Sequence, residues 1–136
     1  IYVNDDEARQ VADQFGIAYT NDRDLIAGLY SHFGKDIIVT YGDRGAMGMV
    51  KGQWLERTPL ITVTAVDTIG AGDTFIGYFA SGMQLGFPLQ QAFDKAMIAA
   101  AFACTQYGGA SSIPEADCVE RYYKRFSGGA PCFKLG

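Results

Sequence analysis

The most informative segment of this 136-residue chain is Val66-Asp67-Thr68-Ile69-Gly70-Ala71-Gly72-Asp73-Thr74-Phe75. It leads from an extended run into a helix, with Gly70 and Gly72 where the helix begins and Asp73 in its first turn. Glycines let a bound group approach the backbone closely, and the amides and dipole of a helix start attract phosphate. Beside such a site, Asp73 is suited to take a proton from a hydroxyl that attacks a phosphoryl group. The residues equally allow a structural interpretation, in which Asp73 is an ordinary first-turn acid and the glycines only permit a turn.

Helix and strand signals alternate before this segment. Between Asn4 and Gly16, apolar residues recur with the i, i+3, i+4, i+7 spacing of one helix face, and a second helix is expected at 22–33. Short β-rich runs bounded by glycine predict strands. The expected strands or strand ends are 1–3, 37–41, 46–50, 53–56 and 61–66. The Lys51-Gly52 turn predicts a hairpin or meander.

Helices dominate after the glycine-rich segment. They are expected at about 73–85, at 89–107 and, after Pro114, over a final amphipathic stretch carrying Val119 and Phe126. The last residues, 127–136, hold glycines and a proline and are expected to form a loosely ordered tail. The pattern predicts an α/β fold with a mostly parallel sheet flanked by helices and a small antiparallel hairpin.

Composition excludes several classes of function. The chain has 11 Lys and Arg against 15 Asp and Glu, a formal charge of −4, which offers no electrostatic footprint for nucleic acid or acidic membranes. The longest apolar run, 96–103, is too short to span a bilayer and is expected to be a buried helix. Three cysteines without paired spacing predict neither a disulfide framework nor a zinc site, so a cytoplasmic protein is expected. The chain begins at Ile1 in what looks like a strand, which suggests a fragment.

Four segments, in the same order, resemble the ribokinase-like (PfkB) carbohydrate kinases. The segment 67–75 resembles the C-terminal signature of that family, a long and unusual pattern. Asn4-Asp5-Asp6-Glu7 resembles its Asn-x-x-Glu element, and 39–45 resembles its Thr-x-Gly-x-x-Gly turn. The stretch 103–114 resembles the loop that closes the adenine and monovalent-cation sites. The resemblance implies the C-terminal part of a ribokinase-like fold, with 1–126 as its nucleotide-binding and catalytic part.

The resemblance implies an ATP-dependent kinase that transfers a phosphoryl group to a hydroxyl of a sugar or a sugar-like substrate. Asp73 would be the general base. The backbone amides of Gly70, Ala71, Gly72 and Asp73 would form an anion hole for the transferring group. Family members are roughly twice as long as this chain, and their sugar-contacting residues lie mainly in the N-terminal part.

The resemblance also implies a nucleotide site. Asn4 and Glu7 would help to place phosphates bound to Mg²⁺, with Glu7 acting through water, and Thr40, Gly42 and Gly45 would line the nucleotide. Gly108 would belong to the adenine side of the site. In members that use K⁺, the matching positions are Asp67, Ile69, Ala103, Gly108 and Ser112.

Other interpretations remain open at this point. Asn4 with Glu7 is also the pattern of a capping box, Thr40-x-Gly42 is also an ordinary strand-to-turn signal, and Asp67 is also suited to cap a turn. Nucleoside kinases share the signature, so the acceptor is either a sugar or a nucleoside. The chain could also be a nucleotide-binding module, or a structural half without activity of its own. A homodimer of the longer parent is left open.

Overall fold

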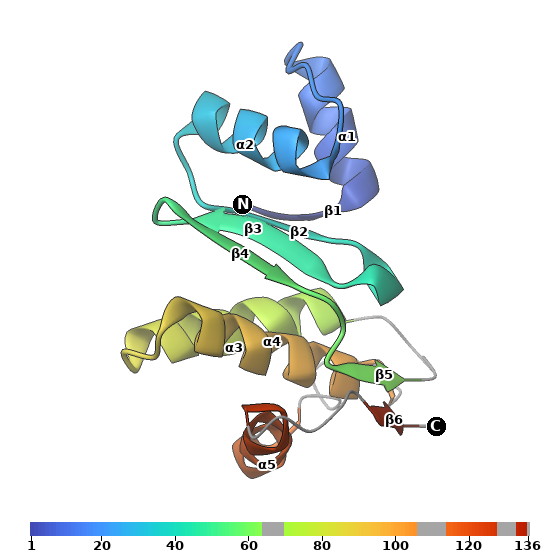
Figure 1. Cartoon of the computed structure of the whole chain (residues 1–136), viewed down its shortest axis with the longest axis vertical. Helices are drawn as coiled ribbons and strands as arrows, with labels where there is room; N and C mark the ends of the chain where they lie inside the picture. Colours follow the sequence, from blue (N-terminus) through green and yellow to red (C-terminus); the bar gives the residue numbers. More distant parts are fainter. Residues whose placement is uncertain (64–69, 106–113, 128–132, 136) are drawn as a thin grey trace. The chain divides into compact units, whose positions relative to one another are not determined.

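A computed structural model describes residues 1–63, 70–105, 114–127 and 133–135 (Figure 1). The chain divides into two compact units, unit 1 (Ile1–Thr58) and unit 2 (Pro59–Gly136). The sequence assigns residues 1–126 to one functional part. Unit 1 lies wholly within that stretch, and unit 2 extends beyond it. Each unit has its own secondary structure and core.

Unit 1 is a four-stranded sheet with two helices on one face (Figure 1). Its elements, in chain order, are β1 (Tyr2–Asn4), α1 (Asp5–Gln14), α2 (Asp22–Phe33), β2 (Ile37–Thr40), the 3-10 turn η1 (Gly42–Arg44), β3 (Ala46–Val50) and β4 (Gln53–Arg57). Apolar side chains from both helices and the sheet form one core. Its fully buried members include Ala8, Ala12, Leu25, Ile26, Ile37 and Val39. The predicted α/β arrangement and the helices at 5–15 and 22–33 are thus confirmed within one or two residues.

The sheet of unit 1 is mixed. β1 and β2 are parallel, whereas β2, β3 and β4 are antiparallel neighbours. The predicted hairpin is present, since β3 and β4 are joined by Lys51 and Gly52, both of which have positive φ, as a tight hairpin turn requires. The sequence predicts a mostly parallel sheet, but two of the three strand pairs in this sheet are antiparallel. Only a short 3-10 turn connects β2 to β3, and so short a link cannot join parallel strands.

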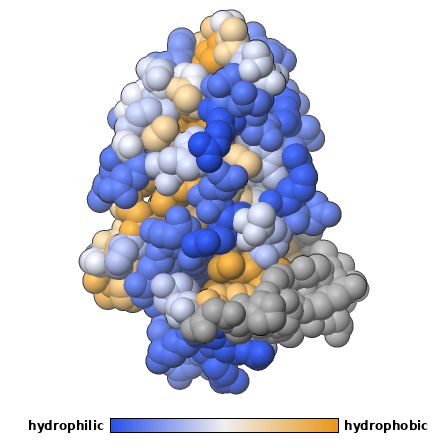
Figure 2. Space-filling model, viewed as in Figure 1, coloured by the Kyte–Doolittle hydropathy of each residue, from blue (hydrophilic) through white to orange (hydrophobic). Residues whose placement is uncertain are grey.

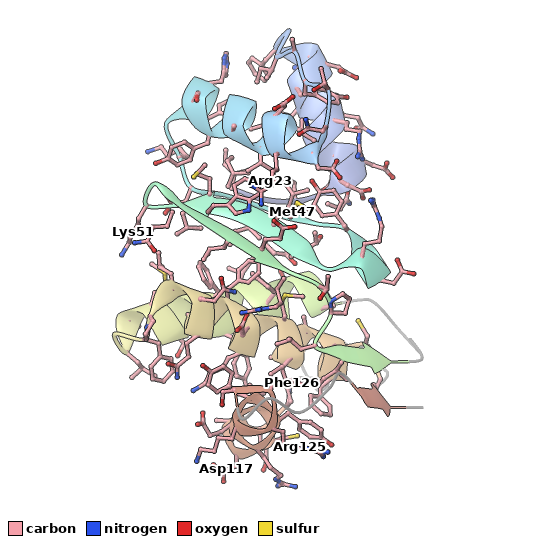
Figure 3. All side chains as sticks on the ribbon, in the orientation of Figure 1. Arg23, Met47, Lys51, Asp117, Arg125 and Phe126 are labelled. Carbon is pink, nitrogen blue, oxygen red and sulfur yellow. The ribbon has the colours of Figure 1, made fainter. Side chains whose placement is uncertain are left out.

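Arg23 fastens α2 to the hairpin side of this sheet. Its guanidinium lies 4.7 Å from the centre of the Trp54 ring and forms a 2.7 Å ion pair with Glu56. Figure 3 shows Arg23 extending from α2 toward the strands. A hydrogen bond from the Trp54 ring nitrogen, together with Arg23, lowers the pKa of Glu56 below its ordinary value.

The described residues of unit 2 form three helices and a short pair of strands. Its elements are β5 (Ile61–Val63), α3 (Ala71–Gln84), α4 (Leu89–Ala103), α5 (Ala116–Ser127) and β6 (Phe133–Leu135). α3 begins two residues earlier than expected. α4 ends at Ala103 rather than at Tyr107, because the amide and the hydroxyl of Thr105 both donate to the carbonyl of Phe102 and turn the chain. The part of the expected strand from residue 64 to residue 66 lies outside the described residues.

Of the loosely ordered tail that the sequence predicts over 127–136, the structure describes residues 127 and 133–135. Ser127 is the last residue of α5, and β6 pairs with β5 in parallel, with Ile61 opposite Phe133 and Val63 opposite Leu135. Strand pairing satisfies backbone groups that a loose tail would leave to water. No glycine or proline falls within 133–135, so these residues lack the composition that predicts a tail.

The apolar stretch 96–103 is buried in α4 as expected, with Ala96, Ile98 and Ala99 fully buried. None of the helices in the described ranges combines the length and the apolar character needed to cross a membrane.

α5 is an amphipathic helix that packs on α4. Val119 belongs to the buried core of unit 2, and Phe126 packs against that core. Figure 3 shows Phe126 on the opposite side of α5 from Asp117 and Arg125, and the outer surface of this helix is hydrophilic in Figure 2. Lys95 strengthens the contact: its ammonium pairs with Glu120 of α5 and lies 5.1 Å from the centre of the Tyr123 ring.

Two glycines of α3 provide a matched test of how closely α3 and α4 pack. A Cβ on Gly82 would lie 2.9 Å from the Cβ of Ala92 in α4, whereas a Cβ on Gly77 would meet nothing within 4 Å. Gly77→Ala is expected to stabilise the protein by about 0.5–1 kcal/mol, because alanine is the better helix former. Gly82→Ala is expected to destabilise it by about 1–2 kcal/mol, since the clash outweighs that gain. Urea unfolding of both variants gives the comparison, and equal shifts would contradict the close packing.

Candidate functional site

The first turn of α3 carries the predicted Gly70, Ala71, Gly72 and Asp73 in one place. Gly70 is the N-cap, with φ 81° and ψ −4°, and it has no side chain with which to cap the helix. The first turn closes when the amide of Thr74 donates to the carbonyl of Gly70 at 2.9 Å. The amides of residues 71–73 therefore have no acceptor within the helix. Asp73 is exposed, so its carboxylate is accessible beside them.

Residues just after Asp73 anchor this turn. Thr74 and Phe75 are 3% and 2% exposed. The ring of Phe75 packs against Phe93 of α4 at 5.6 Å and against Phe79 at 6.0 Å between ring centres. The anchored Phe75 fixes the start of α3 against α4 while Asp73 stays accessible. A helix start held in this way can present its amides to a ligand with little loss of conformational entropy.

In unit 1, the carboxyl ends of the parallel strands β1 and β2 lie side by side. Asn4 and Thr40, the last residues of these strands, are register partners. Asn4 is also the N-cap of α1: its side chain accepts from the amide of Glu7 at 2.8 Å, and Glu7 accepts from the amide of Asn4 at 3.0 Å. The capping-box interpretation of this pair is therefore confirmed. It does not exclude ligand binding, because each carboxylate oxygen can accept more than one hydrogen bond.

The predicted glycine turn follows Thr40 at the same edge. The amide of Tyr41 donates to the carbonyl of Gly45 at 2.8 Å, and the amide of Gly45 donates back to Gly42 at 3.2 Å. Gly45 has φ 103° and ψ −144°, which favours glycine strongly. A Cβ there would lie 2.1 Å from the carbonyl oxygen of Arg57. Asn4, Glu7, Thr40, Gly42 and Gly45 thus meet at one edge of the sheet, the edge where open α/β sheets bind ligands.

Four charged side chains beside this edge form what we call the charged cluster, comprising Asp5, Arg9, Asp22 and Arg44. Arg9 binds Asp22 at 2.8 Å and Asp5 at 3.3 Å, and Arg44 binds Asp5 at 3.0 Å and approaches Asp22 at 4.0 Å. This cluster is not predicted from the sequence. Only the i, i+4 spacing of Asp5 and Arg9 could have indicated it.

Tyr41 lies under the charged cluster, with its ring centre 5.0 Å from the guanidinium of Arg44. The residue is 4% exposed, and its hydroxyl has no hydrogen-bond partner among the described residues. Burial, followed by the negative charge of Asp22, raises the pKa of Tyr41 to about 12. The phenol is therefore held neutral well beyond the pH at which an exposed tyrosine ionises.

This raised pKa predicts a loss of stability in alkali. An unfolded tyrosine ionises near pH 10 and the folded Tyr41 only near 12, so above pH 10 the unfolded state releases a proton that the folded state keeps. The free energy of unfolding should therefore fall from about pH 10 upward. Tyr41→Phe should be as stable as the wild type at pH 7, since it removes an unpaired hydroxyl, and should lose less stability in alkali. Guanidinium unfolding of both proteins between pH 8 and pH 12 provides the comparison. Parallel curves would contradict the assignment.

Several expected site residues cannot be located. Asp67, Ile69, Gly108 and Ser112 lie outside the described residues. Ala103, the remaining position of the implied K⁺ site, is fully buried at the end of α4. Across the described ranges, no group of three or more His, Cys, Asp and Glu side chains is arranged to hold a metal ion.

Comparison with known proteins shows which family this chain is similar to. The sequence profile described as pfkB family carbohydrate kinase matches residues 1–116. A deoxyribokinase from Salmonella typhi is 41% identical over 88 residues, which cover 65% of this chain and 28% of that protein.

Solved structures show the same similarity in the fold. The ribokinase from Thermotoga maritima superposes with a TM-score of 0.75 at 30% identity, over 90% of this chain and 42% of that one. A putative ribokinase II from Escherichia coli, solved in complex with ATP and Mg²⁺, gives a TM-score of 0.72 at 26% identity, over 91% of this chain and 38% of that one. The chain thus spans less than half the length of these relatives. Its sequence and its fold agree on one assignment: the chain belongs to the pfkB family of carbohydrate kinases.

Proposed function

We propose that the complete protein carrying this chain is an ATP-dependent kinase that phosphorylates a hydroxyl of a sugar or a sugar-like alcohol. The observation that carries the proposal is the first turn of α3, where uncapped amides and the exposed carboxylate of Asp73 occur together. A deoxyribokinase and a ribokinase among the similar proteins support a sugar as the acceptor. The E. coli relative, whose structure contains ATP and Mg²⁺, supports the nucleotide.

The two helix starts fit different charges. α3 has one acid in its first turn and no side-chain cap, so its amides favour an anion such as a transferring phosphoryl group. α1 has a complete capping box and three acids, Asp5, Asp6 and Glu7, in its first turn. That helix start disfavours a bare phosphate but suits phosphates that carry Mg²⁺. The amides at the start of α3 and the acids at the start of α1 therefore fit the ATP and Mg²⁺ that the family resemblance implies.

The proposed chemistry divides between these groups. When bound, ATP supplies the phosphoryl group and Mg²⁺ offsets its negative charge. The carboxylate of Asp73 accepts the proton of the attacking hydroxyl. The amides of residues 70–73 donate hydrogen bonds to the charge that develops on the transferring group. Thr40, Gly42 and Gly45 line the nucleotide, and Asn4 and Glu7 orient the Mg²⁺-bound phosphates, with Glu7 acting through water.

A K⁺ site belongs to the proposal as well. It would be formed by Asp67, Ile69, Ala103, Gly108 and Ser112, the positions that match family members with such a site.

A substrate panel on the complete enzyme tests the proposed function. Deoxyribose, ribose, other sugars and nucleosides are incubated with Mg-ATP, with and without K⁺, and ADP and phosphorylated product are measured. Turnover of a sugar is the expected result. If only nucleosides are turned over, the phosphoryl acceptor is a nucleoside and not a sugar. If calorimetry shows binding of Mg-ATP but no compound is turned over, the protein is a nucleotide-binding module and the proposed kinase activity is wrong.

A further inference from the structure

The glycine turn at 42–45 is packed at one end only. Gly45 is buried against Arg57, whereas Gly42, Asp43 and Arg44 are exposed. Strand pairing fixes the chain on both sides of the turn, at Thr40 and Ala46, but does not reach residues 42–44. The position of these three residues relative to the helices therefore depends on contacts that their side chains make.

Arg44 makes such contacts with two helices. Its guanidinium donates to Asp5, the first residue of α1, at 3.0 Å, and approaches Asp22, the first residue of α2, at 4.0 Å. Arg9 joins the same two carboxylates, so the charged cluster is a closed ring of two cations and two anions. A networked pair of this kind is held more firmly than an isolated surface ion pair, which contributes little.

The charge of Arg44 is already matched within the protein. Asp5 and Asp22 face it, and the buried ring of Tyr41 lies beneath it. The hydrogen bond to Asp5, at 3.0 Å, is charge-assisted and so is stronger than a neutral one. This geometry assigns the guanidinium to a link between the turn and the start of α1.

We propose that Arg44 is a positioning residue that holds the Gly42–Gly45 turn against the first turn of α1, so that the two segments face the nucleotide at a fixed spacing. The inference rests on the proposed function, which assigns the nucleotide to these two segments. Asp5 is the partner through which Arg44 acts, and Tyr41 is the platform on which its guanidinium rests.

The test uses the complete enzyme with five variants: Arg44→Ala, Arg44→Lys, Asp5→Ala, the double variant of Arg44→Ala with Asp5→Ala, and Asp13→Ala as a matched control. Asp13→Ala makes the same change in charge on the same helix, but Asp13 is exposed, lies outside the first turn and is not a member of the charged cluster. Arg44→Ala and Asp5→Ala should each raise the KM for ATP about tenfold, with kcat within about twofold of wild type. The double variant should be no worse than either single variant, because both remove one link. Arg44→Lys should rescue only part of the loss, since an ammonium cannot bridge both carboxylates as a guanidinium does.

Other outcomes overturn the inference in distinguishable ways. If Arg44→Ala weakens ATP binding and Asp5→Ala does not, Arg44 contacts the nucleotide directly. If Asp5→Ala and Asp13→Ala change the KM for ATP equally, the effect is one of net charge. If all variants bind Mg-ATP as the wild type does, the inference fails and the proposed function stands. If the wild-type enzyme itself binds no Mg-ATP by calorimetry, the proposed function fails and the inference fails with it. Thermal unfolding of each variant shows that the changes occur in folded protein.

Discussion

Asp73→Asn in the complete enzyme should lower kcat by about 10³-fold, within the range that general acid–base catalysis contributes. Asparagine keeps the size and the hydrogen-bonding oxygen of the side chain but cannot accept the proton of the attacking hydroxyl. Asp73 is exposed in the first turn of α3, so the substitution disturbs no buried contact. Stability and the Kd for Mg-ATP should therefore stay near the wild-type values. Single-turnover kinetics and calorimetric titration on the same preparation measure both quantities.

The control for this variant is Asp117→Asn, which makes the same chemical change in the first turn of α5. It should leave kcat unchanged. A variant at Asp73 that keeps wild-type turnover would exclude Asp73 as the base. A variant that loses Mg-ATP binding to the same extent as turnover would assign Asp73 to binding instead.

Gly45→Ala is expected to have the largest effect on stability, about 3–5 kcal/mol. The added methyl group would lie 2.1 Å from the carbonyl oxygen of Arg57, and φ 103° with ψ −144° is a conformation that alanine adopts only with strain. The added Cβ and the carbonyl oxygen of Arg57 are both fixed to the backbone, so the backbone of the turn or of β4 has to move. The midpoint of thermal unfolding should fall by more than about 10 °C, and the KM for ATP should rise because the turn is displaced.

Gly34→Ala is the matched control for strain without a clash. Gly34 caps α2 with φ 60°, and a Cβ there would meet nothing within 4 Å. Its substitution should cost about 1 kcal/mol, the cost of the left-handed conformation alone. Similar losses at both positions would show that the contact with Arg57 can relax, and would remove the steric argument for glycine at position 45.

The sequence predicted those parts of the fold that have local signals. α1, α2 and the β3–β4 hairpin follow from apolar spacing, capping residues and the Lys51-Gly52 turn, which all lie within a few residues of the element they define. The predicted end of α4 was wrong, because the hydrogen bond from Thr105 to the carbonyl of Phe102 leaves no strong signature in the sequence. The pairing of β6 with β5 joins segments that are far apart in the chain, and no pattern within either segment records it.

The candidate site shows the same division. Gly70–Asp73 and the glycine turn were found because a contiguous motif carries them, and the resemblance to a family gave them roles. The link between Arg44 and Asp5 spans 39 residues and depends on how β1 and β2 pair, so it becomes visible only in the folded chain. The residues proposed to bind a ligand thus carry a signal in the sequence, whereas those proposed to hold them in place do not.

The pairing of β5 with β6 has a consequence for the order in which the chain folds during synthesis. Every strand of the unit 1 sheet has been made once Arg57 is added, so that sheet can form while the ribosome is still translating unit 2. β5 follows almost at once, but its partner is not synthesised until residues 133–135. Throughout that interval β5 lacks the strand with which it pairs in the folded chain, and the backbone groups that β6 later satisfies stay available for incorrect pairing.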